Sequence, residues 1–146
     1  MVIVLIGILS YGAVSLYASR DGFAGFIAKG QLVSTGLLAQ KVALGMSAVA
    51  NPVSLQITRR SSDDFWVFTL IKSGAVNVVS TQDASGTLMS VDGATLASGA
   101  SRTFTWNSQG SLSDGINHRV YFVGERTYRV CFSASGYVYE SQAACP

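Results

Sequence analysis

Charged residues are scarce in this sequence. Only 12% of its 146 residues are Asp, Glu, Lys or Arg, against about 25% in an ordinary soluble domain. The net charge is +2 and the ten basic residues form no run, so no basic patch marks a nucleic-acid-binding surface. Because 49% of the residues are hydrophobic, part of the chain is expected in lipid or in a subunit interface. The length suits one domain with its own core.

Histidine is scarcer still, and this excludes several kinds of active site. The single histidine, His118, cannot form a metal-binding histidine pair or an HExxH motif, and a core or strand-surface position is favoured over a catalytic one. Asp63 and Asp64 beside Arg59 and Arg60 fit a polar hairpin tip better than an acid/base pair. No glycine-rich phosphate-binding motif is present. The sequence predicts no enzymatic activity, no cofactor and no metal site.

Cysteine occurs only twice, at Cys131 and Cys145. Their spacing excludes a CxxC redox or zinc motif. A disulfide is the economical interpretation, and closing a loop of about 15 residues would restrict the unfolded chain by about 3 kcal/mol in the entropic model. It would also place the folded C-terminal part of the chain in an oxidising compartment, the periplasm or the cell exterior. The alternative is a cytosolic domain with two reduced, buried cysteines.

The first nineteen residues, MVIVLIGILSYGAVSLYAS, carry no charged side chain. A helix of this length just crosses a hydrocarbon core of about 30 Å at about 1.5 Å per residue. A secretory signal peptide is the alternative, but it begins with a basic region, whereas Met1 leads directly into apolar residues. We therefore predict a retained transmembrane helix at residues 1–19.

The helical pattern continues beyond the predicted span. Large apolar residues recur at spacings of three and four: Phe23, Phe26, Ile27, Leu38, Val42, Met46 and Val49. This predicts an amphipathic helix over residues 20–51 that packs its apolar stripe on the head and ends at Asn51, before Pro52. Glycines between residues 21 and 30 weaken the helix, so we expect bending or partial melting there.

After Pro52 the pattern changes to the alternation typical of strands. Predicted strands cover residues 53–58, 65–71, 75–79, 88–91, 102–106, 118–123, 126–132 and 137–140, the last three as an antiparallel meander. Residues 81–101, rich in Ser, Gly, Ala and Thr, are expected to form a poorly packed loop region around one short strand. The predicted class is α+β, with a long N-terminal helix on a small antiparallel head, residues 52–146, closed by a C-terminal disulfide loop.

Residues 1–10, MVIVLIGILS, resemble the hydrophobic N-terminus shared by type IV pilins and type II secretion pseudopilins. In that family an I-G-I-L core follows a short F-T-L-I-E-L opening. The resemblance implies that about seven mature residues precede Met1 in a complete precursor, restoring a span of ordinary length. It also implies cleavage by a prepilin peptidase and places Ile6, Gly7, Ile8 and Leu9 in a filament-core helix.

The rest of the chain carries further resemblance to this family. FTWNSQG at residues 104–110 and the strands after it resemble the end of the H-type pseudopilins. RDGF at 20–23, LLAQKVAL at 37–44 and the late cysteines look most like the C-type minor pilin of the mannose-sensitive haemagglutinin (MSHA) pilus. Both imply the type IV pilin-like fold.

The implied function is that of a minor pilin in MSHA pilus biogenesis and surface adhesion. The alternatives are an H-type pseudopilin in type II protein secretion and a pilus-tip module that binds a ligand or DNA. Tyr137 and Tyr139 alternate onto one face of a predicted strand, which makes them a candidate contact surface.

The resemblance also implies partners and a location. The expected partners are other pilin or pseudopilin subunits, the inner membrane, an assembly platform and, on a complete precursor, the prepilin peptidase; nucleic acid is not expected. The expected location is the inner membrane, as a single-pass protein with a periplasmic head, and the pilus after assembly.

Overall fold

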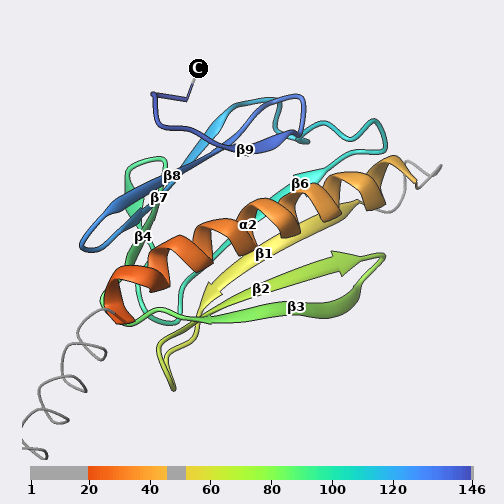
Figure 1. Ribbon diagram of the computed structural model, residues 1–146. Coiled ribbons are helices and arrows are strands. Elements are labelled where there is room, and N and C mark those ends of the chain that lie inside the picture. Colours follow the sequence, from red (N-terminus) through yellow and green to blue (C-terminus); the bar gives the residue numbers. More distant parts are fainter. Residues whose placement is uncertain (1–19, 46–51, 146) are drawn as a thin grey trace, which may run out of the picture.

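The computed structural model describes residues 20–45 and 52–145 of the chain. One long helix, α2 (Arg20–Leu44), lies along two antiparallel sheets (Figure 1). The predicted α+β class, a long N-terminal helix on an antiparallel β head, is confirmed. The predicted membrane span at residues 1–19 lies outside the described residues. Within them, no helix combines the length and the hydropathy needed to cross a membrane.

The strands form two sheets. The four-stranded sheet has the order β3-β2-β1-β6, with β1 (Val53–Arg59), β2 (Phe65–Lys72), β3 (Ala75–Asp83) and β6 (Ser101–Trp106). The five-stranded sheet has the order β5-β4-β7-β8-β9, with β4 (Leu88–Val91), β5 (Ala94–Thr95), β7 (His118–Val123), β8 (Thr127–Phe132) and β9 (Val138–Glu140). The predicted C-terminal meander is β7-β8-β9.

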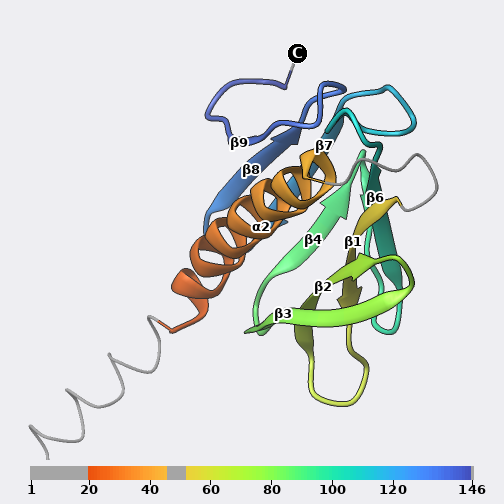
Figure 2. The ribbon, with the colours of Figure 1, turned by 90° about the vertical axis from the view of Figure 1, so that its right-hand side faces the viewer.

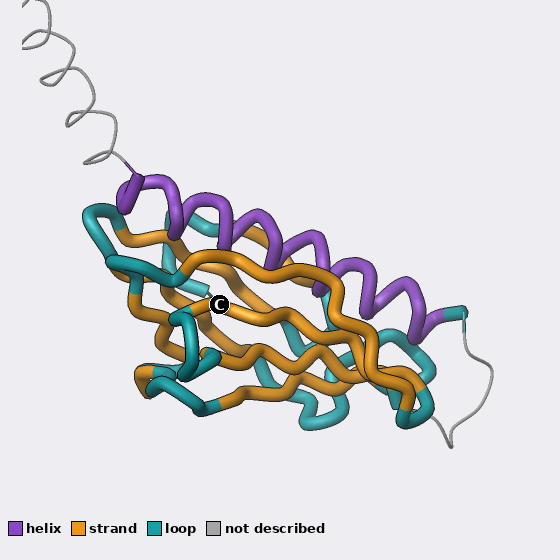
Figure 3. The backbone as a smooth tube through the Cα atoms, turned by 90° about the horizontal axis from the view of Figure 1, so that it is seen from below, coloured by secondary structure: helices purple, strands orange, loops and turns teal. Residues whose placement is uncertain are grey.

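Helix α2 contacts strands of both sheets, and Figures 1 and 2 show it running between them. Seen from below in Figure 3, it covers one side of the strands. The face toward the sheets consists mainly of small side chains: Ala24, Ala28, Leu32, Ala39 and Ala43 are all buried. The strands supply the bulk of the core: Trp66, Phe68, Trp106, Phe122 and Phe132 are fully buried. A helix face this smooth can lie close to the large side chains of the sheets.

The apolar stripe that we expected to pack on the head mostly points away from it. Phe23 is 61% exposed, Phe26 51% and Leu38 41%, so the predicted packing face of the helix is wrong. The large side chains would hold the helix away from the sheets, whereas the alanine stripe on the other side lets it approach. The helix is therefore apolar on two faces, only one of which the head covers.

The expected weakness near residues 21–30 is also wrong, because α2 runs without a break from Arg20. A Cβ on Gly25 would lie 3.2 Å from the Tyr128 ring, and one on Gly36 would lie 2.8 Å from a Val138 methyl group. These glycines permit close packing, and that packing stabilises the helix despite its low propensity. The helix ends at Leu44, followed by Gly45, rather than at the predicted Asn51; residues 46–51 lie outside the described part of the chain.

The region 81–101 is well packed, contrary to prediction. It contains the end of β3 and the hairpin β4-β5, whose turn has positive φ at Asp92 (51°) and Gly93 (88°), as a two-residue hairpin requires. Met89 is fully buried, Leu96 is almost so, and the Leu96 N–H donates a hydrogen bond to the Met89 carbonyl at 2.8 Å. Ser and Gly in this stretch form tight turns between buried apolar residues.

Candidate functional site

The most distinctive surface of the molecule is the side of α2 that faces away from both sheets. We call it the outer face of α2 and define it by Phe23, Phe26, Ile27, Gly30, Ser34, Leu38 and Leu44, all exposed. Positions three and four apart lie on one side of a helix. The outer face is therefore a largely apolar stripe, interrupted near its end by the exposed, charged Lys41, and an exposed apolar surface of this kind marks an interaction site.

A basic residue ties the flank of this stripe to the five-stranded sheet. The Lys29 Nζ lies 2.8 Å from a Glu140 carboxylate oxygen on β9. It also lies 4.4 Å from the ring centroid of Phe26 and 5.0 Å from that of Tyr128. Because Glu140 is half exposed, the ion pair contributes at most about 1 kcal/mol. The pair joins α2 to β9, and at the edge of the outer face the Phe26 ring itself contacts the Tyr128 ring on β8, with centroids 5.9 Å apart.

The predicted cysteine pair forms a disulfide. Cys131 on β8 and Cys145 are both buried, with Cα atoms 5.7 Å apart. The bond holds the C-terminal segment against the sheet. Both cysteines were among the site residues predicted from the sequence.

The two predicted contact tyrosines lie on one face, as their alternation indicated. The rings of Tyr137 and Tyr139 stack with centroids 6.0 Å apart, and Val138 between them is buried. Tyr137 is 53% exposed. Their role as a contact surface stays a prediction. The predicted filament-core residues Ile6, Gly7, Ile8 and Leu9 lie outside the described residues.

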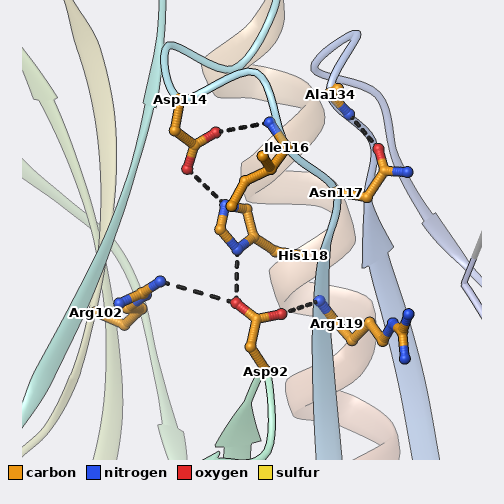
Figure 4. Close-up of polar contacts among 8 residues, drawn as sticks. All are labelled: Asp92, Arg102, Asp114, Ile116, Asn117, His118, Arg119 and Ala134. Atoms are coloured by element: carbon orange, nitrogen blue, oxygen red, sulfur yellow. Dashed lines mark hydrogen bonds and ion pairs between the residues drawn. The ribbon is translucent and has the colours of Figure 1, made fainter.

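The one histidine is the buried member of a polar cluster whose carboxylates reach the surface (Figure 4). His118 is only 2% exposed; its Nδ1 lies 2.6 Å from Asp92 and its Nε2 lies 2.6 Å from Asp114. A neutral imidazole has only one N–H, so two carboxylate partners favour the doubly protonated cation. Burial alone would lower the pKa of His118, but the hydrogen bonds to Asp92 and Asp114 outweigh it and raise the pKa above 6.5.

The carboxylates of this cluster have partners of their own. Asp92 accepts a hydrogen bond from the Arg119 backbone N–H at 2.8 Å and lies 3.8 Å from Arg102. Burial acts to raise the pKa of Asp114, but hydrogen bonds from His118 and from the Ile116 backbone N–H hold it below 3.8. The cluster thus fastens the β4-β5 turn and the loop before β7 to the same strand.

This arrangement is structural rather than catalytic. Both ring nitrogens of His118 are engaged, so neither can exchange a proton with a substrate without breaking the cluster. Among residues 20–45 and 52–145, no group of three His, Cys, Asp or Glu side chains is placed to hold a metal ion. Sequence reasoning missed both partners of His118. Asp114 lies only four residues before His118, so this partner could have been predicted from the sequence. Asp92 is distant in the sequence and comes close only because β4 pairs with β7.

Comparison with known proteins gives matches in structure. No protein-family model and no curated protein matches this sequence. Two crystal structures of the type IV minor pilin FimU from Pseudomonas aeruginosa strain PAO1, in different crystal forms, match its fold. One has a TM-score of 0.58 and 13% identity, covering 86% of this chain and 92% of FimU. The other has a TM-score of 0.54 and 14% identity, covering 78% and 90%.

The chain has the type IV pilin fold. The match extends over most of both chains, so it includes the helix and the head together. In this pilin fold, the outer face of α2 is the side of the helix that the head leaves uncovered. The disulfide and the stacked tyrosines lie instead on the five-stranded sheet.

Proposed function

We propose that this chain is a minor pilin, a structural subunit of a type IV filament. The observation that carries the proposal is the exposed apolar outer face of α2 on a pilin-fold head. In the sequence, this helix directly follows the uncharged residues 1–19. An apolar helix face that its own head does not cover is suited to pack against helices of other subunits.

The physical logic of assembly follows from this surface. Residues 1–19 hold the subunit in the inner membrane, with the head on the periplasmic side, where its disulfide can form. On assembly, the same apolar residues exchange lipid contacts for contacts with neighbouring helices. Small residues such as Gly7 and Gly12 allow those helices to approach closely. A complete precursor is a substrate of the prepilin peptidase and is handled by the assembly platform.

The filament that we favour is a pilus of MSHA type, in which the chain acts in pilus biogenesis and surface adhesion. Resemblance of residues 20–23 and 37–44 to the C-type minor pilin supports this choice. The stacked pair of exposed Tyr137 and half-buried Tyr139 is a suitable contact surface on the head.

The proposal is tested by placing charge on the outer face of α2. Ile27→Glu and Leu38→Glu, made together in the full chain, should abolish incorporation into filaments, because carboxylates are costly in a dry helix interface. Both positions are more than 40% exposed, so the thermal midpoint of the head should change little. Thr103→Glu, on an exposed strand position, is the matched control. Normal filament number and incorporation in the double variant would contradict the proposal.

A deletion strain separates the pilus from the secretion alternative. Loss of surface pili and of surface attachment, with normal release of exoproteins, is expected for an MSHA-type minor pilin. Retained pili with exoproteins trapped in the periplasm would instead assign the chain to the H-type pseudopilins.

A further inference from the structure

One long strand edge of the head is open and carries no charge before its last residue, Asp83. Strand β3 is the outermost strand of the four-stranded sheet, and its first five residues, Ala75–Val79, are all exposed. Val76 is 64% exposed and Val78 61%. No charged residue occurs from Ala75 to Gln82. An outermost strand of this kind presents backbone N–H and C=O groups that can pair with another strand.

The other sheet edges in the described part of the chain are protected. Strand β5 has two residues and β9 has three, too few to template a long pairing. The end of β6 is covered by the loop that follows it, through a bridge between Trp106 and Leu112 and a 2.8 Å hydrogen bond from the Ser113 N–H to the Thr105 carbonyl. Its exposed first half carries the charged Arg102. Strand β3 carries no lysine or proline of the kind that usually blocks edge pairing.

The sequence of β3 is complementary to itself. In an antiparallel pairing of two copies centred on Asn77, Val76 of each copy lies opposite Val78 of the other. Val76 and Val78 lie on one face because they are two residues apart, and their partners on β2 are Ile71 and Thr69. The pairing therefore continues a row of β-branched side chains across both copies, and such cross-strand pairs are favourable. It places no charge opposite another charge.

We propose that β3 is a self-association edge, through which two copies of this chain pair antiparallel about Asn77. The paired segment is short, because the register of β3 on β2 shifts after Val78. The interface is correspondingly small and the association weak. The inference does not depend on the minor-pilin assignment, since β3 lies on the head, apart from the outer face of α2.

Cysteine cross-linking tests both the partner and the register. In the full chain, whose two native cysteines are joined to each other, Asn77→Cys adds one thiol at the proposed symmetry axis. Mild oxidation should yield a covalent dimer. Thr81→Cys, exposed on the same strand, is the matched control. In the proposed register the two Thr81 Cα atoms lie roughly 26 Å apart along the strands, beyond the reach of a disulfide, so no dimer is expected.

A second pair of variants guards against cross-linking by random collision. Val76→Lys with Val78→Lys in the Asn77→Cys background should abolish the dimer, because it sets lysines opposite each other. Leu88→Lys with Ile116→Lys, at exposed positions elsewhere, should leave it intact. The proposal is overturned if neither cysteine variant cross-links, if both do so equally, or if Asn77→Cys in cells is captured by a different protein instead of a second copy.

Discussion

The Nε2 atom of His118 lies 2.6 Å from a carboxylate oxygen of Asp114. This contact holds the loop before β7, which contains Asp114, against the first residue of the strand. Asp92 occupies the other ring nitrogen at the same distance. The histidine is almost fully buried while both carboxylates are partly exposed. The pairing therefore links a buried cation to two surface turns, and its strength depends on pH.

The first prediction concerns that dependence. The folded pKa of His118 is raised, so its contribution to stability is full below 6.5, its unfolded value, and is lost as pH rises through the folded pKa. The folded pKa of Asp114 is lowered, so its contribution is full above 3.8 and is lost as pH falls through the folded value. Thermal midpoints measured across pH should be highest between these limits.

The variant His118→Asn should flatten the alkaline side of this pH profile of the thermal midpoint. An unchanged profile would refute the cluster's role.

The second prediction compares two glycines of α2. Gly36→Ala should destabilise the head by about 1–3 kcal/mol through overpacking, because its Cβ would lie 2.8 Å from a buried Val138 methyl group. Gly30→Ala should stabilise it by up to about 1 kcal/mol, since nothing lies within 4 Å of the new Cβ. Urea unfolding measures both. Equal effects of the two substitutions would show that close packing does not explain Gly36.

The third prediction concerns the disulfide. Cys145→Ser should lower the free energy of unfolding by about 3 kcal/mol and the thermal midpoint by on the order of 10 °C. Ala144→Ser, at an exposed neighbouring position, is the control and should change neither. Scanning calorimetry of the oxidised proteins is the measurement, and a midpoint shared by all three proteins would contradict it.

The fourth prediction concerns how much of the helix the head needs. A fragment starting at Arg20 should fold, because it keeps the buried Ala24, Ala28 and Lys29. A fragment starting at Gln31 loses these contacts and should be less stable by about 2 kcal/mol or more. Denaturant midpoints of the two fragments would decide it. Equal midpoints would mean that the first part of α2 adds nothing to the head.

Local pattern in the sequence was sufficient for much of this structure. The alternation of Val53, Leu55 and Ile57 with polar residues, and the short turn after Val123, specify strands because side chains in a strand alternate between faces. The cysteine spacing pointed to the disulfide on chemical grounds alone. Resemblance at residues 1–10 pointed to the pilin fold that the head then showed.

Only the tertiary structure decided which surfaces are covered. The periodicity of the large apolar residues predicted the wrong packing face for α2. Packing selected the smooth stripe around Ala28, Leu32 and Ala39 and left Phe23, Ile27 and Leu38 exposed. The contact of His118 with Asp92 and the open edge of β3 likewise follow from strand pairing between distant segments. Such pairing depends on long-range contacts, which local sequence patterns do not record.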